Sequence, residues 1–404
     1  MYIYDNYAPG KIVAALDREC AFLNPADYHG NQVLDGVDFE KVEIIFNSGE
    51  SNSLNSPSDI NNDDSGIGCI VLIHLKDNSK ESVIAAAEKL EDNPRVVYAE
   101  PDYLYDEYII PNDFYFDRLW GVRKIEAPNA WNYTTGNGGV VVGVTDSGIN
   151  YNHEDIRKNM WKSRDNRYVN GVNFAGDGRN PDDISGHGTH VAGTIGALGN
   201  NFIGITGVCW DVKVAALRIG SGVFSLDAAI AAINFANLHK IPILNNSWGG
   251  RVYSPSLKYA IEQYNGLFVV ASGNYGTNND YIPDYPSSYD SDNIISVAAS
   301  NQNDALTSFS NYGVKSVDIA APGIDIFSLG LNDGYSYKSG TSMAAPHVAG
   351  AAALLKSYMP CLNALDIKGI ILSSVKKNAS LKNKISSGGV LDINAAVETA
   401  DRLA

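Results

Sequence analysis

The sequence predicts an α/β fold: a three-layer α/β/α domain with a mostly parallel sheet, preceded by a small α+β domain. After about residue 140, long apolar strands alternate with amphipathic helices, whereas residues 10–102 show shorter strands around one helix. Charge is also divided unevenly, because residues 1–108 carry 21 Asp and Glu against 7 Lys and Arg, a balance of −14 out of a total of −16. We therefore expect two domains with different surfaces, residues 1–108 and 109–404.

The composition is that of an ordinary globular protein of 404 residues, with 45% hydrophobic and 19% charged residues. No apolar run reaches the ~18 residues that a membrane span needs. The N-terminal segment lacks the apolar stretch of a secretory signal, so the protein is not exported by that route or the sequence begins after signal removal. The acidic balance argues against a nucleic-acid partner, since phosphate binding needs a basic face. The four cysteines form no CxxC pair and are expected to be buried or incidental thiols.

The first domain alternates strand and helix signals in an order that resembles a split β-α-β unit of the ferredoxin-like kind. Between its second and third strands, residues 48–66 are rich in Ser, Asn and Asp and predict a flexible surface loop. A Tyr-rich acidic segment at residues 102–108 (DYLYDEY) follows and is expected to be a linker or processing site. The expected elements are strands at residues 10–16, 42–46, 69–75 and 95–99 and a helix at residues 79–90.

The second domain is predicted to contain near-continuous Val, Ile and Leu strands, which are typical of a parallel sheet covered on both faces. Ligands and catalytic groups gather at the carboxyl ends of such strands. Asp146 and Asn274 both stand at an expected strand end, where chemistry is expected. The expected strands are residues 140–145, 212–219, 242–248, 267–274 and 293–300, and the expected helices are residues 187–198, 225–239, 256–264 and 341–358.

Three segments carry candidate catalytic residues: VTDSGIN (144–150), SGHGTHVAG (185–193) and SGTSMAAPHVAG (339–350). Taken singly, the Asp is typical of a turn, the paired His of metal ligands, and the Ser of a helix start. Together they place an Asp, a His and a Ser, in that chain order, each in a Gly-rich turn at a strand end or helix start. That constellation predicts nucleophilic catalysis by a triad.

The same segments closely resemble the signatures of the subtilase family of serine peptidases, and the resemblance covers about residues 110–404. It implies a subtilisin-like fold, endopeptidase activity on protein or peptide substrates, and a triad of Asp146, His187 and Ser342. Ser342 would attack the scissile carbonyl, His187 would take its proton, and Asp146 would orient the imidazole. His190, the second histidine of HGTH, is expected to be structural. Four further segments support the resemblance: NNSWGG (245–250), ASGN (271–274), SFSNYG (308–313) and IAAPG (319–323).

The resemblance also implies how the substrate is held. Asn274 matches the oxyanion-hole asparagine, with the backbone N–H of Ser342 as the second donor. An extended substrate is expected to lie along one edge of the site and to bond with the backbone there. The expected substrate-binding residues are Ser247, Trp248, Gly249, Gly250, Gly273 and Asp284.

The side chain preferred at P1 depends on Asp284, which matches a position at the base of the family's S1 pocket. A carboxylate there would favour Lys or Arg. No Lys or Arg lies between Arg95 and Arg118, where self-cleavage would occur. An aromatic or large apolar P1 residue fits the Tyr-rich junction better and is the expected preference.

A structural Ca²⁺ is implied as well, because LGNNFIGITGV (198–208) resembles the loop that wraps the family's high-affinity ion. Calcium prefers six to eight oxygen ligands, which the proposed mixture of carboxylate, amide and carbonyl groups supplies. One extra residue near Gly199, relative to the family pattern, puts the loop geometry in question. The expected ligands are Asp113, Asp155, Asn201 and the backbone carbonyls of Ile203 and Ile205.

The first domain resembles the family's inhibitory propeptide, which templates folding and places its C-terminal tail in the active site. Cleavage is expected within residues 104–112, after Tyr105 or Tyr108. Three alternatives remain open: a pseudoprotease that retains its propeptide as a regulatory binding protein, a processing protease with one dedicated substrate, and a metal-dependent hydrolase that uses the HxxH pair. We expect a monomer that is secreted, with a cytoplasmic or spore-associated location as the alternative.

Overall fold

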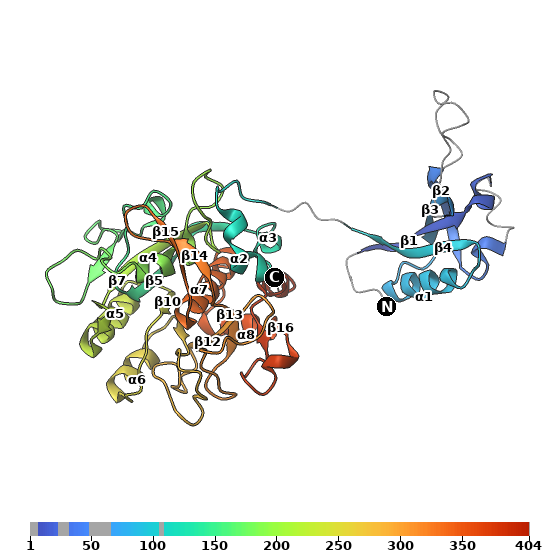
Figure 1. The fold of residues 1–404 in the computed structure, drawn as a ribbon. Helices are drawn as coiled ribbons and strands as arrows, with labels where there is room; N and C mark the ends of the chain where they lie inside the picture. Colours follow the sequence, from blue (N-terminus) through green and yellow to red (C-terminus); the bar gives the residue numbers. More distant parts are fainter. Residues whose placement is uncertain (1–6, 23–31, 48–65, 105–108, 404) are drawn as a thin grey trace. The chain divides into compact units, whose positions relative to one another are not determined.

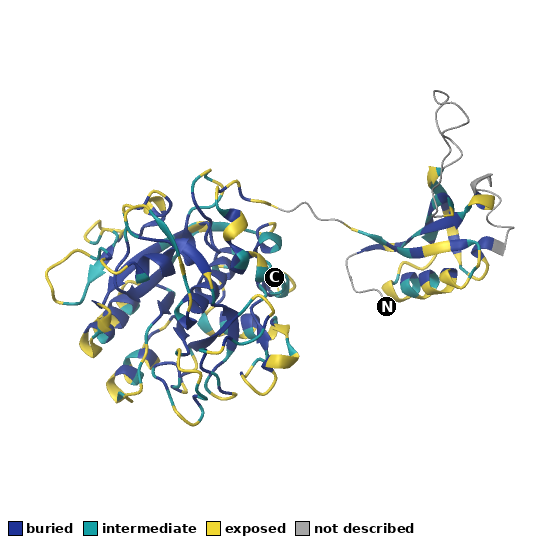
Figure 2. Cartoon of the chain, in the orientation of Figure 1, coloured by how far each residue is buried: buried dark blue, intermediate teal, exposed yellow. Residues whose placement is uncertain are grey.

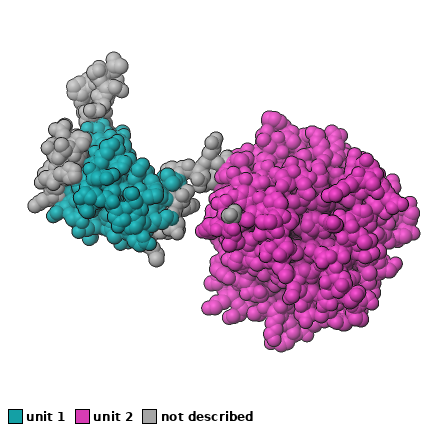
Figure 3. All heavy atoms as spheres, turned by 180° about the vertical axis from the view of Figure 1, so that it is seen from behind, with its two compact units in different colours: residues 1–107 teal, residues 108–404 magenta. Residues whose placement is uncertain are grey.

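The computed structural model describes residues 7–22, 32–47, 66–104 and 109–403. The chain divides into two compact units, residues 1–107 and 108–404, which Figure 3 shows in different colours. The division falls one residue before the expected domain boundary. Apart from Gly66, the expected loop at 48–66 lies outside the described residues, as do Tyr105 and Tyr108.

The first unit is a four-stranded antiparallel sheet in the order β2-β3-β1-β4 (Figure 1). Strands β3 and β4 both pair with β1, and helix α1 connects them, so the strand order is that of a split β-α-β unit. Ser79 caps α1, because its side-chain oxygen accepts a hydrogen bond from the Ser82 N–H at 3.2 Å. The elements are β1 (Tyr7–Asp17), β2 (Phe39–Asn47), β3 (Ile67–Leu75), α1 (Lys80–Glu91), β4 (Val96–Tyr103) and two short 3-10 helices at Arg18–Phe22 and Gln32–Leu34.

The second unit is built on a nine-stranded sheet in the order β16-β17-β13-β12-β11-β10-β5-β7-β6. Every pairing in it is parallel except β16 with β17. The strands are β5 (Gly136–Asp146), β6 (Gly171–Asn173), β7 (Asp211–Arg218), β10 (Ile243–Asn246), β11 (Leu267–Ala271), β12 (Ile294–Ser300), β13 (Ile319–Pro322), β16 (Lys376–Lys377) and β17 (Gly389–Val390). Two hairpins stand outside the sheet, β8 (Gly220–Ser221) with β9 (Val223–Phe224) and β14 (Ile326–Leu329) with β15 (Tyr335–Lys338).

Helices cover both faces of this sheet, as the strand composition predicts. Along β11, Leu267 and Val269 pack into the core that contains α4 and α7, whereas Phe268 and Val270 pack into the core that contains α5 and α6. Figure 2 shows the sheet and α7 as buried, with exposed residues on the outer helices. The helices are α2 (Trp120–Lys124), α3 (Ala127–Ala130), α4 (His187–Gly196), α5 (Leu226–Leu238), α6 (Pro255–Glu262), α7 (Thr341–Tyr358), α8 (Ala364–Ser373) and α9 (Ile393–Asp401).

All five strands expected for the second domain are present in the sheet, and the four expected helices are α4 to α7. The sequence analysis did not recognise β13, whose four residues end in a proline, a residue that argues against a central strand. It also missed α8, although the Asn363 and Asp366 side chains form a capping box at its start, which is a readable signal. Within the described residues, no helix combines the length and the apolar character that crossing a membrane requires.

Candidate active site

The candidate catalytic residues converge at the carboxyl edge of the large sheet, because parallel strands end at the same edge. Asp146 is the last residue of β5, and β5 pairs with β10, which ends one residue before Ser247. The neighbouring strand β11 ends at Ala271, three residues before Asn274. Helices α4 and α7 begin at this edge, and α7 runs through the middle of the unit (Figure 1).

Asp146 and His187 form a hydrogen-bonded pair in which Asp146 is buried and His187 is partly exposed. The His187 Nδ1–H donates to Asp146 Oδ1 at 2.8 Å, and the Ser147 N–H donates to the same oxygen at 2.7 Å. Asp146 is fully buried. Burial of the His187 ring lowers its pKa, but the charge of Asp146 and the hydrogen bond to it outweigh that effect and leave the pKa above its usual value.

Ser342 lies in the first turn of α7, beside the strand that ends at Asn246. Its Oγ donates to the Ser247 carbonyl at 3.2 Å, and the Ser247 Oγ donates to the Ser342 carbonyl at 2.9 Å. Within the described part of the chain, no hydrogen bond joins Ser342 to His187. Such bonds are often long in enzymes without substrate and tighten in the reacting complex. The hydroxyl therefore needs only a rotation about its Cβ–Oγ bond to turn its proton away from Ser247.

Asn274 is oriented by Thr341, a residue that the sequence analysis did not single out. The Thr341 backbone N–H donates to Asn274 Oδ1 at 2.8 Å, and the Thr341 hydroxyl donates to the same atom at 3.0 Å. A backbone N–H is only a donor, so the oxygen assignment is fixed and Nδ2 must point the other way. Among the described residues, neither Asn274 Nδ2 nor the Ser342 backbone N–H has a hydrogen-bond partner. Two donors are thus available for an anion.

Asn311 holds the loop that carries Asn274, and its role was also not foreseen, although SFSNYG (308–313) had been noted. Its backbone N–H donates to the Gly273 carbonyl at 2.9 Å. Its side-chain oxygen accepts from the Tyr275 N–H at 2.8 Å and the Thr277 N–H at 3.2 Å. The buried Asn311 side chain thus provides hydrogen bonds to backbone groups of a loop that has no regular secondary structure.

Asp284 lies between the two segments that flank the site. A Cβ built on Gly249 would stand 2.5 Å from Asp284 Oδ1, and one built on Gly273 would stand 3.3 Å from its carboxyl carbon. The residue is 3% exposed, and in the described part of the chain no hydrogen bond or ion pair reaches its carboxylate. Burial raises the pKa of Asp284 to about 6, although the charge of Arg251 opposes the rise.

A hollow of about 400 Å³ lies beside the segment that contains Gly249 and is bounded mainly by apolar and glycine residues. Trp248 and Gly249 line it with Gly250. Gly250 was expected to form backbone hydrogen bonds with the substrate. Its N–H and C=O groups already pair with Tyr285, at 2.8 and 2.7 Å, and are not available for this. Only the backbone from Ser247 to Gly249 is left for an extended ligand.

Comparison with known proteins agrees with this geometry. Residues 137–388 match the model of the subtilase family. The chain belongs to the subtilase family. It is 36% identical over 329 residues to the thermophilic serine proteinase of Bacillus sp. (strain AK1), covering 80% of this chain and 77% of that protein. It is 38% identical over 255 residues to thermitase of Thermoactinomyces vulgaris, covering 61% and 85% of the two chains.

A solved structure gives the same result for the fold. A protease from Pseudoalteromonas arctica PAMC 21717 superimposes with a TM-score of 0.60 at 29% identity, covering 72% of this chain and 99% of that one. The predicted subtilisin-like α/β fold and serine protease class are therefore confirmed. As a subtilase, the chain acts on protein or peptide substrates.

The expected calcium loop of this subtilase brings two buried carboxylates together. Burial raises the pKa of Asp113 to about 6, and burial followed by the charge of Asp113 raises that of Asp155 to about 7. Asp113 Oδ1 is buried without a hydrogen-bond partner. In the described residues, the carbonyl oxygens of Ile203 and Ile205 accept no hydrogen bond. A hard cation would satisfy all of these oxygens, so the residues fit Ca²⁺.

Asn201 is held within the loop by two hydrogen bonds. Its Nδ2 donates to Asp155 Oδ1 at 2.8 Å, and its Oδ1 accepts from the Ile203 N–H at 2.7 Å. The Asn201 oxygen keeps a second lone pair, to which an ion could bind. The Ile205 N–H also donates to Asp155 Oδ2 at 2.8 Å, which keeps the loop closed around that carboxylate.

His190 is structural, and the HxxH pair does not converge on one point. His190 Nε2 lies 2.9 Å from the Ile326 carbonyl and 3.2 Å from that of Ser336, whereas His187 faces Asp146. Burial lowers the pKa of His190 to about 3, so the ring is neutral. Across the described ranges, no group of three or more His, Cys, Asp or Glu side chains is arranged to hold a metal ion.

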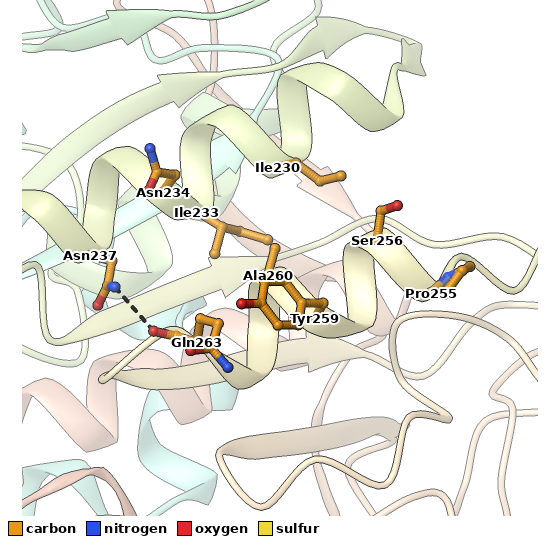
Figure 4. Close-up of a pocket in the computed structure, with 9 residues that line it drawn as sticks. All are labelled: Ile230, Ile233, Asn234, Asn237, Pro255, Ser256, Tyr259, Ala260 and Gln263. Atoms are coloured by element: carbon orange, nitrogen blue, oxygen red, sulfur yellow. Dashed lines mark hydrogen bonds between the residues drawn. The ribbon is translucent and has the colours of Figure 1, made fainter.

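A larger hollow of about 650 Å³ lies between α5 and α6, and none of the candidate catalytic residues lines it (Figure 4). The Asn237 side chain donates to the Gln263 carbonyl across it at 3.0 Å. Its lining contains no carboxylate, imidazole, amine or thiol. Size alone therefore does not identify the reactive site in this subtilase.

Proposed function

We propose that this subtilase is a serine endopeptidase that works through an acyl-enzyme, with Ser342 as nucleophile, His187 as general base and Asp146 as the group that orients the imidazole. The observation that carries the proposal is the 2.8 Å bond from His187 Nδ1–H to the buried Asp146. It fixes the proton on Nδ1, which leaves Nε2 as an acceptor for the Ser342 proton.

The reaction follows from that tautomer. His187 Nε2 takes the Ser342 proton as Oγ attacks the scissile carbonyl, and the carbonyl electron pair moves to oxygen. The free Asn274 Nδ2–H and Ser342 N–H supply hydrogen bonds to that oxyanion. The imidazolium then gives its proton to the leaving amine, the C–N bond breaks, and water repeats the sequence to release the acid and free Ser342.

Reaction with a serine-directed phosphonate tests the proposal, with Ser342→Ala as the matched control. We expect wild type to gain the mass of one phosphonyl group and to cleave casein, and the control to do neither. An unreactive wild type would favour the pseudoprotease. Labelling without casein cleavage would favour a processing protease with one dedicated substrate. Activity that resists the phosphonate and is lost in chelator would favour the metal-dependent hydrolase.

We further propose that Asp284 forms the base of the S1 pocket. The ionisation state of its carboxylate would then determine which P1 side chain the pocket prefers. Its carboxylate has no partner in the described part of the chain, which supports a cationic Lys or Arg partner when it is ionised. When it is protonated, the same pocket suits an aromatic side chain such as the tyrosines of the expected processing segment. This revises the apolar preference expected from the junction alone.

We also propose that Asp113, Asp155, Asn201 and the carbonyls of Ile203 and Ile205 hold a structural Ca²⁺. Bound there, the ion would compensate the charge of two buried carboxylates and fix the loop that follows α4. The residues of the active site themselves perform the proton transfers.

We infer that the first unit is an inhibitory propeptide and that the protein is made as a zymogen. Two features support this: the unit has its own hydrophobic core, and its split β-α-β order is that of the family's propeptides. The expected cleavage sites at Tyr105 and Tyr108 fall outside the described residues. A monomeric state and secretion remain predictions.

A further inference from the structure

The DSG turn and the start of α4 meet at unusually short distances. A Cβ on Gly188 would stand 2.2 Å from the Gly148 carbonyl oxygen and 3.0 Å from the Asp146 Cβ. A Cβ on Gly148 would stand 2.6 Å from the Asp182 carbonyl oxygen. Only glycine permits both approaches. The DSG turn, the first turn of α4 and the segment that contains Asp182 therefore pack closely together beside the Asp146–His187 pair. Asp183 is the side chain at their junction.

The Asp183 carboxylate is buried, at 5% exposure, and accepts five hydrogen bonds. Its Oδ1 accepts from the Ser147 hydroxyl at 2.8 Å and from the Ser185 N–H and hydroxyl at 2.8 and 3.3 Å. Its Oδ2 accepts from the Thr189 N–H at 3.0 Å and the Thr189 hydroxyl at 2.7 Å. Every neighbour is a donor, which is the environment of a carboxylate and not of a neutral amide.

Ser147 connects this carboxylate to the catalytic pair. Its backbone N–H donates to Asp146 Oδ1, the same oxygen that receives the His187 proton. Its hydroxyl donates to Asp183 and accepts from the Gly188 N–H at 3.0 Å. A single serine therefore ties the catalytic aspartate, the first turn of α4 and Asp183 together.

The first turn of α4 is anchored by the same group of residues. The N-cap, Gly186, has no side chain, and the first N–H groups of a helix need acceptors. The His187 N–H donates to the Ser185 hydroxyl, the Gly188 N–H to Ser147, and the Thr189 N–H to Asp183. The orientation of His187 thus depends on contacts made through Asp183.

We propose that Asp183 is a positioning residue of the triad, which locks His187 onto Asp146 through Ser147 and supplies a second buried negative charge behind the imidazole. It does not contact substrate. The inference rests on the proposed triad. Two consequences follow, one geometric and one electrostatic, and they are separable by experiment.

The electrostatic consequence concerns the His187 imidazolium that forms during the reaction. Four charged or titratable groups act on His187: Asp146 at the end of β5, Asp183, Lys338 of β15, and His190 on the same helix. The charges of Asp146 and Asp183 raise the pKa of His187, and that of Lys338 lowers it. Removing the Asp183 charge lowers the His187 pKa, so the acid limb of kcat/KM moves to lower pH.

The deciding variant is Asp183→Asn, produced as the full chain and measured after its processing, with the active sites counted by the phosphonate. Misplacement of the base should lower kcat about 10- to 100-fold. KM should change less than about twofold, because Asp183 does not touch substrate. The acid limb should move to lower pH, because the charge of Asp183 raises the His187 pKa.

Two further variants separate the roles. Thr189→Val keeps the Asp183 charge and the serine bridge, so we expect a lower Tm with an unmoved acid limb. Ser147→Ala keeps the charge but breaks the bridge, so we expect kcat to fall with KM and the acid limb unchanged. The losses in Asp183→Asn and Ser147→Ala should not add in the double variant, since both break one connection.

If Asp183 only caps helix α4, Asp183→Asn should lower the thermal stability but keep the wild-type kcat and acid limb. That outcome would overturn the proposal. If Asp183→Asn does not fold, Ser147→Ala decides, and a wild-type kcat there overturns the proposal. A wild type that fails to react with the phosphonate would instead overturn the triad assignment.

Discussion

Thr341 orients the Asn274 amide, the proposed donor to the oxyanion. Thr341 donates twice to Asn274 Oδ1, and its own hydroxyl accepts from the Gly273 N–H at 3.2 Å. The hydroxyl therefore links the oxyanion loop to the start of α7. Without it, the amide keeps only the backbone bond and has more freedom to rotate.

We predict that Thr341→Val lowers kcat about fivefold with little change in KM, because one hydrogen bond of about 1 kcal/mol is lost from the group that faces the oxyanion. Thr341→Ser keeps the hydroxyl and should retain wild-type kcat. Asn274→Ala should lose about 10²–10³ in kcat, a magnitude known from subtilisin itself and not calculated for this chain. Steady-state kinetics with an anilide substrate measures all three, and equal losses in the Val and Ser variants would contradict the orientation by Thr341.

We expect Asp284 to give the chain a pH-dependent choice of substrate. Its pKa is about 6, so the carboxylate is mostly neutral at pH 5 and mostly ionised above pH 7. We predict that kcat/KM for a P1 Arg substrate, relative to P1 Phe, rises about 10- to 100-fold between those values, since a charge-assisted hydrogen bond forms only with the ionised group.

Asp284→Asn should abolish that rise, whereas Asp292→Asn, which changes an exposed carboxylate later in the chain, should leave it intact. Matched peptide anilides that differ only at P1 supply the measurement. If the ratio of kcat/KM for P1 Arg to that for P1 Phe does not change with pH in wild type, Asp284 does not form the base of the S1 pocket.

At the residue scale, the sequence indicates the proposed catalytic groups but not the residues that position them. Asp146, His187, Ser342 and Asn274 stand in short motifs, and the structure gathers them at one sheet edge. Thr341, Asn311 and Asp183 act through contacts with residues far along the chain or through loops without periodicity. The unavailability of the Gly250 backbone likewise depends on its pairing with Tyr285 in three dimensions.

Among the elements, we expect the loop after α4 to depend most on the proposed Ca²⁺ for its stability. It closes over Asp155 and lies against Asp113, two carboxylates that burial penalises when they are charged. A cation removes that penalty. The native state should therefore be stabilised by Ca²⁺ through mass action, by about 2.7 kcal/mol at a hundredfold excess over the dissociation constant.

We predict that replacing 1 mM Ca²⁺ with chelator lowers Tm by roughly 5–10 °C for a domain of this size. The measurement belongs in the Ser342→Ala background, where self-digestion does not distort the transition. Asp155→Asn should lose most of the calcium effect, and Asp333→Asn, at an exposed position, should keep it. A Tm that is indifferent to chelator in the Ser342→Ala protein would show that the loop holds no ion.

Elements with strong periodicity were predictable, and short ones were not. The strands of the sheet centre are continuous apolar runs, and α7 has a long apolar sequence that could be recognised from 341 to 358. Strands β6, β16 and β17 have two or three residues each and form only because the rest of the sheet presents an edge. Tertiary context decides such elements.

The whole molecule consists of two units that each have their own hydrophobic core. The first core joins one face of the β2-β3-β1-β4 sheet to α1, and the second joins the large sheet to helices on both faces. Because each unit buries its own apolar side chains, cutting the chain between them leaves both cores intact. Proteolysis in that region is therefore compatible with two folded products.

We predict that the freshly purified wild-type protein, incubated with Ca²⁺, splits into fragments of about one quarter and three quarters of its mass, with a new N-terminus within residues 105–113. Ser342→Ala should remain whole under the same conditions, because the cut requires its own nucleophile. Intact mass spectrometry of the two proteins side by side is the measurement.

If the mass of the smaller fragment places Tyr105 or Tyr108 at its C-terminus, the pocket with a protonated Asp284 accepts an aromatic P1 residue. If Ser342→Ala is cut as well, a contaminating protease is responsible. If both proteins stay whole while wild type still reacts with the phosphonate, the triad stands and the zymogen needs another protease for its activation.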